Sequence, residues 1–435
     1  IEDIANNKDW SIVNIKNDVT TNTSHKNLGM IIDNSGSLTV SGDNSVTNSW
    51  YLYLDGTLDL QDDSQLIQEI NSDLVTSATG KIIRRQEGNL NLYWYNYWSS
   101  PVGQQAVTNN TNTDFSIDML KDGSQFIQFT SDLSPNPTTT NPVTISNQWL
   151  YKFQNGVTYY AWERLTESSS IEPGVGYTQK GSSVLDGEKQ YTFEGKPNNG
   201  TILLSAVDTG GPGNVEDVSL TTYLVGNPYP SALDARQFIA DNSSVIGGTL
   251  LLWEQWAGRS HFLADYEGGY GFINNLTTER AYQYPGIPIA DQVQTQGIKK
   301  PTFYIPVGQG FFVEVENDGN IEFNNGQRVF VKESDVLADQ EDVNYSDNGS
   351  SFFRTSGTNN SESGIEDTTS ETQILRLEFG VSNGASRSFV LGFTPDATDG
   401  YDYGLDGGLI NDPPEDDTGS LLNEQQYVIQ AFAPY

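Results

Sequence analysis

The chain has 435 residues, enough for about three domains of ordinary size. Its formal charge is −35, because 57 Asp and Glu residues stand against 22 Lys and Arg residues. Nucleic acids and anionic membrane surfaces are bound by clustered basic residues, so we expect neither as a partner. Cysteine is absent and only two histidines occur, which removes disulfides, thiolate metal sites and multi-histidine zinc sites. We also expect no membrane insertion, since no apolar run is long enough to span a bilayer.

Residues 1–88 carry a repeat with a glycine turn in each copy. The copies read SGSLTV at 35–40, DGTLDL at 55–60 and TGKIIR at 79–84. A short strand with alternating apolar residues follows each glycine, and a spacing of roughly 20 residues is typical of one coil of a β-solenoid. An ordinary β-meander with similar turns is the alternative. Because Gly, Asn, Ser, Thr and aromatic residues are abundant, the sequence predicts an all-β protein.

Residues 89–333 are predicted to form two β-sandwich modules of jelly-roll type, 89–215 and 216–333, related by duplication. Four motifs recur in the same order in both halves. The pairs are YWSSP at 97–101 with VGNPYP at 225–230, WLYKF at 149–153 with LLLWE at 250–254, PGVGY at 173–177 with VGQGF at 307–311, and FE at 193–194 plus NNG at 198–200 with EFNNG at 322–326. One of the four spacings differs, which insertions at 104–147 and 257–300 explain.

The composition changes at two points in the last hundred residues. Residues 334–371 are rich in Asp, Glu, Ser, Asn and Gly, so they predict an acidic linker or loop. Residues 372–435 predict further β-strands: a hairpin formed by 374–379 and 388–393, and a strand at 427–432.

Five ordered motifs carry a resemblance to a known group of proteins. They are YWSSPVG at 97–103, LVGNPYPSALDARQFI at 224–239, an apolar strand with Trp253, PVGQGFFVEV at 306–315, and LRLEF with FVLGFTPDATDGYDYGLDGG between 375 and 408. From about residue 90 onward the chain resembles large secreted surface proteins of Bacteroidota that the type IX system exports, many of them adhesin-like. The resemblance implies an extracellular or cell-surface location. It also implies a C-terminal sorting domain, removed during export or lying outside this sequence.

An acidic, glycine-rich segment is the candidate metal site. Asp396, Asp399, Asp402 and Asp406 follow one another at spacings of three, three and four residues. Glycines between them allow the backbone to fold back, so the carboxylates could surround Ca²⁺, although the pattern is not that of an EF-hand. The alternative is a solvated turn in which each Asp accepts hydrogen bonds from nearby backbone N–H groups.

Aromatic residues in the second insertion and just before it are the candidate ligand site. Trp253, Trp256, Tyr266 and Tyr270 could stack on sugar rings, which predicts glycan binding. The run at 93–98 also holds five aromatic residues, but alternation places them on both faces of one strand, which favours core packing.

The residues favour a non-enzymatic structural or adhesive surface protein. His261 and Asp265 could form a base and its orienter, but no G-x-S-x-G motif accompanies them. The alternatives are a carbohydrate-binding module and, less favoured, a polysaccharide-degrading enzyme. Strand-like runs at 9–15 and 427–432 could pair between copies and build a surface fibre, unless both pair inside their own chain.

Overall fold

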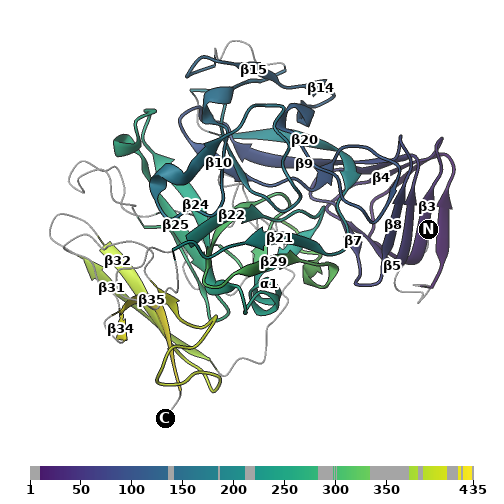
Figure 1. Cartoon of the computed structure of the whole chain (residues 1–435). Helices are drawn as coiled ribbons and strands as arrows, with labels where there is room; N and C mark the ends of the chain where they lie inside the picture. The colour runs from purple at the N-terminus through teal and green to yellow at the C-terminus, as the bar shows by residue number, and fades with distance from the viewer. Residues whose placement is uncertain are drawn as a thin grey trace.

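A computed structural model describes residues 10–135, 142–184, 187–210, 221–282, 297, 299, 301–333, 372–380, 386–408, 420–422 and 425–433. The predicted acidic linker at 334–371 lies outside these residues. The fold is mostly β, with an N-terminal β-solenoid of about 4 turns followed by several antiparallel sheets. The solenoid forms one end of the molecule, and the C-terminal sheet packs beside the central modules (Figure 1).

Two parallel sheets form the solenoid, which confirms the predicted N-terminal β-solenoid. The first contains β1 (Ile12–Ile15), β3 (His25–Ile32), β5 (Ser45–Leu54), β7 (Gln65–Gln68) and β8 (Asp73–Thr76). The second contains β2 (Asp18–Thr21), β4 (Ser37–Val40), β6 (Thr57–Leu60) and β9 (Lys81–Asn89). Leu38, Leu58 and Ile82 occupy one register position of the second sheet and are fully buried. Because the coils repeat in register, each adds one layer to a continuous apolar core.

The repeated glycines allow neighbouring coils to approach closely. A Cβ at Gly36 would lie 2.3 Å from the Ile15 carbonyl oxygen, and one at Gly56 would lie 2.1 Å from the Gly36 carbonyl oxygen. At Gly80 the corresponding distance to the Leu54 carbonyl oxygen is 1.9 Å. Only glycine fits where one backbone lies this close to the next.

The central sheets of the two modules have the same strand order when β10, β19, β17 and β18 are matched in turn with β22, β28, β24 and β25. This agrees with the duplication read from the motifs. In the first module the order is β10-β19-β17-β18, and in the second it is β22-β28-β24-β25-β26. The first-module strands are β10 (Tyr95–Trp98), β17 (Tyr151–Phe153), β18 (Trp162–Arg164), β19 (Tyr177–Lys180) and β20 (Glu188–Pro197). Their counterparts, with two flanking strands, are β21 (Ile202–Ala206), β22 (Thr221–Gly226), β24 (Ile246–Ala257), β25 (Glu267–Ile273), β26 (Thr278–Glu279), β28 (Gly310–Val315) and β29 (Gly319–Phe323).

Short elements fill the space around these sheets. The first insertion carries β12 (Thr108–Asn109), β13 (Lys121–Asp122), β14 (Gln125–Phe126), β15 (Gln128–Thr130), β16 (Thr144–Ser146) and the 3-10 turn η3 (Asn147–Trp149). Helix α1 (Ala235–Asp241) begins after Asp234, whose carboxylate accepts a hydrogen bond from the Arg236 backbone N–H. It buries Phe238 and Ile239 against the second module. The remaining short strands are β11 (Val102–Gly103), β23 (Ala232–Asp234), β27 (Tyr304–Ile305) and β30 (Arg328–Val329).

Reciprocal backbone contacts join the two modules. The Ser99 N–H donates to the Gly308 carbonyl oxygen at 2.7 Å, and the Gly226 N–H donates to the Gly174 carbonyl oxygen at 3.0 Å. In the motif alignment Gly226 is the counterpart of Ser99, and Gly174 is the counterpart of Gly308. Gly174 and Gly308 both have positive φ, at 88° and 72°, a conformation that glycine adopts without strain. The modules therefore meet through a pseudo-twofold contact in which each presents the same two turns.

The C-terminal sheet has the order β31-β32-β35-β33 and forms from the predicted strands. It contains β31 (Gln373–Gly380), β32 (Ser386–Phe393), β33 (Gly407–Gly408), β34 (Ser420–Leu422) and β35 (Gln425–Phe432). Strands β31 and β32 pair antiparallel over their full length, as the hairpin prediction requires. Strand β35 pairs with β32 on one side and with β33 and β34 on the other. The strand predicted at 427–432 is therefore an interior strand, not an open edge.

Candidate functional site

The site with the most varied chemistry is an aromatic cluster where the second module meets the first. We call it the module-boundary cluster. Its members are Tyr95, Tyr97, Trp149, Lys180, Trp253, His261, Tyr266 and Tyr270. Strand β10 positions Tyr95 and Tyr97 on one face, while Trp98 points the other way and is fully buried in the core. The alternation in the 93–98 run thus places one aromatic face in the core and the other on this boundary.

Two of the predicted ligand residues line this cluster beside β10. Trp253 on β24 stacks on Tyr97, with ring centroids 6.2 Å apart and planes 15° from parallel. Tyr270 on β25 meets the Trp253 ring edge to face at 5.1 Å. Burial, followed by the Tyr270 hydroxyl, raises the pKa of Tyr97 well above its usual value. Trp256, another of the predicted ligand residues, is half-buried on β24 at a β-bulge.

Lys180 occupies a cage of three aromatic rings. Its Nζ lies 4.3 Å from the Trp149 ring centroid, 4.5 Å from that of Tyr95 and 4.7 Å from that of Tyr266. The same Nζ donates a 2.8 Å hydrogen bond to the Tyr266 hydroxyl. The residue is only 2% exposed, and burial lowers the pKa of Lys180 to about 7. The ring faces favour the charged amine, which partly opposes this effect of burial.

His261 lies over this cage. Its ring stacks on Trp149 at 4.6 Å, its Nδ1 lies 3.3 Å from Lys180 Nζ, and its Nε2 lies 2.8 Å from the Ser134 hydroxyl. Burial and the Lys180 charge lower the pKa of His261 to about 4. The imidazole is therefore neutral at pH 7.

Half-buried rings and polar groups alternate across the cluster. Tyr95, Trp253, Tyr266 and Tyr270 are each partly exposed, so part of each side chain reaches solvent. Tyrosine hydroxyls lie beside these rings, whereas the buried Lys180 amine is already bonded to the Tyr266 hydroxyl. An uncharged polyol fits such a surface, because its CH groups pack on rings while its hydroxyl groups bond to the polar atoms.

The predicted calcium segment forms hydrogen-bonded turns. The Asp402 carboxylate accepts from the Thr398 N–H at 2.6 Å, and the Asp406 carboxylate accepts from the Asp402 and Ala431 N–H groups, both at 2.7 Å. Asp396 and Asp399 are exposed. The bonds to Asp402 and Asp406 match the part of the alternative in which carboxylates accept from backbone N–H groups, although Asp406 is buried and Ala431 is distant in the sequence. Calcium binding at the four aspartates stays a prediction.

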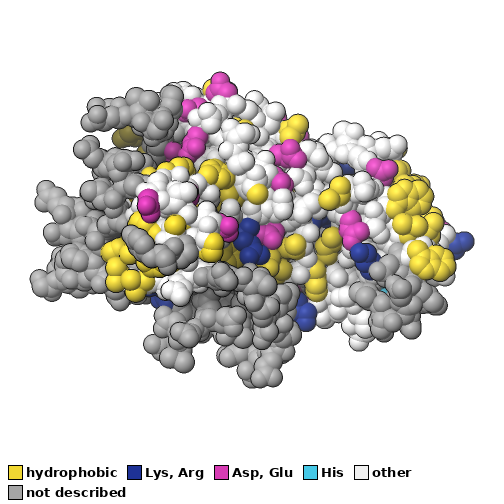
Figure 2. All heavy atoms as spheres, turned by 90° about the horizontal axis from the view of Figure 1, so that it is seen from below, with side chains coloured by type: hydrophobic (Ala, Val, Ile, Leu, Met, Phe, Trp, Pro, Cys, Tyr) yellow, Lys and Arg dark blue, Asp and Glu magenta, His cyan; other side chains and the backbone are white. Residues whose placement is uncertain are grey.

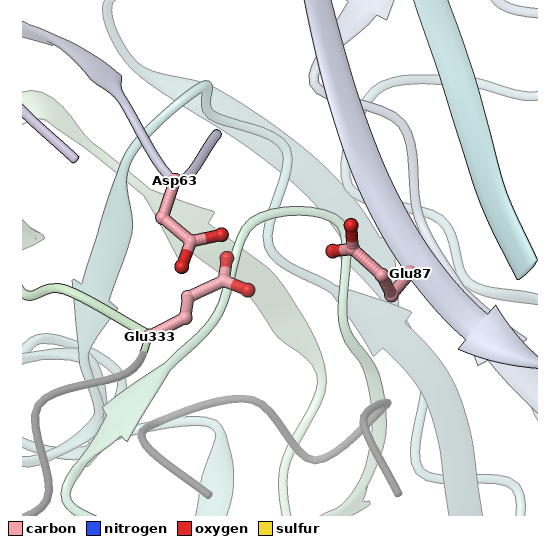
Figure 3. Close-up of side chains that lie close together, drawn as sticks. All are labelled: Asp63, Glu87 and Glu333. Atoms are coloured by element: carbon pink, nitrogen blue, oxygen red, sulfur yellow. The ribbon is translucent and has the colours of Figure 1, made fainter. Parts of the chain in front are cut away.

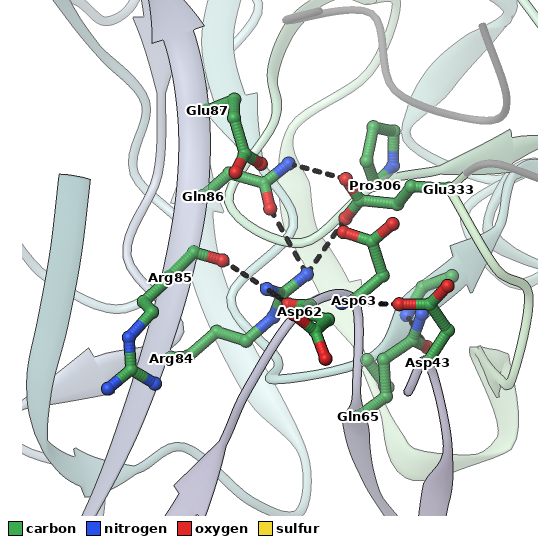
Figure 4. A network of polar contacts seen from close by, with 12 residues as sticks. Asp43, Asp62, Asp63, Gln65, Arg84, Arg85, Gln86, Glu87, Pro306 and Glu333 are labelled. Carbon is green, nitrogen blue, oxygen red and sulfur yellow. Dashed lines mark hydrogen bonds and ion pairs between the residues drawn. The ribbon is translucent and has the colours of Figure 1, made fainter. Parts of the chain in front are cut away.

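An acidic group that the sequence analysis missed lies between the solenoid and the second module. Asp63, Glu87 and Glu333 each direct one carboxylate oxygen to within 4.8 Å of the others, the only such group of metal-ligand side chains in the part of the chain described (Figure 3). Arg84 shares this space (Figure 4). Its Nη2 donates to Glu333 at 3.0 Å, and neither side chain is exposed. A guanidinium therefore already supplies positive charge to these carboxylates.

A family model described as a domain of unknown function, DUF8693, matches residues 4–434. The chain belongs to this family. No solved structure matches it. Among the described helices, none is both long and apolar enough to cross a membrane.

Replacing Arg84 tests the buried ion pair. Arg84→Met leaves Glu333 buried without its guanidinium, and breaking such a pair costs roughly 3–5 kcal/mol of unfolding free energy. Lys26→Met is the control, because Lys26 and Glu69 form a partly exposed pair at 2.7 Å whose loss costs at most about 1 kcal/mol. Urea unfolding measures both variants. Equal losses would contradict the role given to Arg84.

Lys180 predicts a dependence of stability on pH. Its pKa of about 7 in the folded protein lies below the ordinary value of 10.5, so between these pH values the unfolded chain binds the extra proton. The free energy of unfolding of the wild type should therefore rise relative to Lys180→Met as pH increases from 7 toward 10.5, by up to about 1.4 kcal/mol per pH unit. Parallel pH profiles of the unfolding free energy for the two proteins would show that burial does not lower the pKa of Lys180.

Proposed function

We propose that this protein is a non-enzymatic adhesive or structural protein of the cell exterior, and that the module-boundary cluster is its carbohydrate-binding site. The observation that carries the proposal is the set of partly exposed rings around Lys180, with tyrosine hydroxyls beside them. The solenoid and the joined modules supply a rigid framework on which such a site is held. The resemblance to secreted surface proteins of Bacteroidota supports the extracellular location.

The chemistry of the cluster favours binding over turnover. Lys180 is enclosed by rings, and a His261 imidazole with a pKa of about 4 is a weak general base at pH 7. Glycoside cleavage uses a pair of carboxylates flanking the bond, and the cluster as defined contains none. A polysaccharide-degrading enzyme is therefore the less favoured alternative, and its signature would be the release of new reducing ends.

Conservative variants test glycan binding at the cluster. Tyr266→Phe and Tyr270→Phe keep the ring faces and each remove one hydroxyl, so each should weaken binding by about 0.5–1.5 kcal/mol. Trp253→Ala removes a stacking face and should weaken it further. Phe126→Ala is the control, because that ring is exposed on β14, away from the cluster (Figure 1).

The measurement is a glycan array followed by calorimetry on the oligosaccharides retained. Loss of binding in the three cluster variants with unchanged melting temperature supports the proposal. A wild-type protein that binds no glycan on the array would refute the carbohydrate site. Release of reducing ends that a single Asp or Glu change abolishes would refute the non-enzymatic assignment.

A second candidate function is self-assembly into a surface fibre. Among the described residues, β1 pairs only with β3 and β2 only with β4, so no described strand covers the outer edge of either strand. In the C-terminal sheet, β31 pairs only with β32 within the same described set, whereas β35 is paired on both sides. A head-to-tail contact would therefore join the β1 edge to β31, not to β35. Open edges template such pairing.

Deleting residues 1–16 tests assembly, because it removes β1. Fibres of the intact protein, seen by electron microscopy, should disappear while circular dichroism shows that the remaining β structure persists. If the intact protein stays a monodisperse monomer at high concentration by light scattering, self-assembly by strand pairing is excluded.

A further inference from the structure

The outer face of the first solenoid sheet and the turn before it carry exposed or half-buried aromatic side chains and one exposed isoleucine that belong to no site described above. We call Trp10, Ile12, Trp50, Tyr51 and Tyr53 the solenoid platform. Trp10 is 73% exposed, Ile12 55% and Trp50 49%. Hydrophobic side chains gather on the molecular surface at the end where the solenoid lies (Figure 2). Exposed apolar patches of this kind mark interaction sites in soluble proteins.

The parallel register lines these side chains up in rows. Ile12, Gly29 and Tyr51 occupy equivalent positions on β1, β3 and β5, and Tyr53 follows two residues later on the same face. Between them the alternate residues, such as Leu52, point into the core and are fully buried. Adjacent strands lie about 4.8 Å apart, so the rows repeat at a short, constant interval.

Gly29 has no side chain, so the sheet surface is flat between Ile12 and Tyr51. A Cβ at this position would lie 3.3 Å from the Tyr51 carbonyl oxygen and 3.8 Å from Ile12 Cγ1. Any side chain would therefore stand up between Ile12 and Tyr51. The Trp50 and Tyr51 rings lie close together, with centroids 5.7 Å apart. The result is a low surface bordered by rings, suited to an extended flat ligand.

The charge of the platform limits the class of partner that it can bind. Its five side chains are uncharged, in a chain whose net charge is −35. Asp73 occupies the next position in the row of Tyr51, and burial together with Tyr53 and Asp73 raises the pKa of Tyr51. Hydroxyl and carboxylate groups therefore border the rings, and no basic residue occupies this row to attract an anion. A second copy of the chain would bring a strongly acidic surface, which like charge opposes.

We propose that the solenoid platform binds a neutral, extended polysaccharide, whose sugar faces pack on Trp10, Trp50 and Tyr51 and whose hydroxyl groups bond to Tyr53 and Asp73. This surface is separate from the module-boundary cluster and does not depend on it. Two separate carbohydrate sites on one rigid chain would raise the avidity for a polymer beyond that of either site.

The test measures retention on insoluble neutral polysaccharides: cellulose, chitin and β-1,3-glucan. The double variant Trp50→Ala/Tyr51→Ala and the single variant Trp10→Ala alter exposed or half-exposed rings, and Phe126→Ala is again the control. Losing two stacking faces should weaken binding roughly tenfold or more for the double variant. Trp10→Ala should lose less, and Phe126→Ala should bind like the wild type. Circular dichroism and melting temperature verify that each variant is folded.

Cluster variants separate this proposal from the carbohydrate site above. Tyr266→Phe should keep the platform intact, so its binding to the insoluble polymer should still fall when Trp50→Ala/Tyr51→Ala is added. The proposal is overturned if the platform variants bind all three polymers as well as the wild type, or if the wild type binds none of them. It is also overturned if light scattering shows a wild-type dimer that the Trp50→Ala/Tyr51→Ala change abolishes, because the face would then join two copies.

Discussion

The close backbone approach between the two modules is the constraint on which the central architecture depends. A Cβ at Gly176 would lie 2.8 Å from the Val225 carbonyl oxygen, and one at the equivalent Gly310 would lie 2.8 Å from the Tyr97 carbonyl carbon. The same two turns therefore interlock twice, once from each module. This contact sets β10 beside β28 and brings the Tyr97 ring onto Trp253. The module-boundary cluster exists because duplicated strands meet at this distance.

Duplication explains how the module-boundary cluster can arise where two copies of one fold meet. In each module the strand before the glycine turn pairs with the strand after it, as Trp98 pairs with Tyr177 and Val225 with Phe311. The two copies differ at this position: Trp98 places a large ring in the core, while its counterpart Val225 is small. The insertions lie outside this shared frame, so they could change without disturbing it. Tyr266 and His261 reach the cluster from one of them.

Much of the fold could be read from the sequence because it depends on local patterns. The glycines at 36, 56 and 80 mark each coil, and the ordered motifs mark the two modules. The candidate ligand residues were also partly predictable, since Trp253, Tyr266 and Tyr270 do meet in one cluster. Lys180 could not be predicted as their partner, because nothing in the sequence of its strand distinguishes it. Only the fold encloses it in rings.

Other features could not be predicted because they join distant segments or depend on backbone geometry. Arg84 and Glu333 pair although they lie 249 residues apart in the sequence, and no local pattern links them. Spacing alone could not decide whether Asp402 and Asp406 bind a cation or backbone, and their hydrogen bonds match the backbone alternative. An aromatic run likewise reads the same whether its rings face a core or a ligand, since both surfaces favour the same residues.

We propose that docking of the two modules creates the carbohydrate-binding site. Hydrogen–deuterium exchange of the wild-type protein, with and without an oligosaccharide retained on the glycan array, tests it most directly. Binding at the module boundary should slow exchange in β10, η3, β19, β24 and β25 and leave the C-terminal sheet unchanged. Slowing confined to segments outside the module boundary would contradict it.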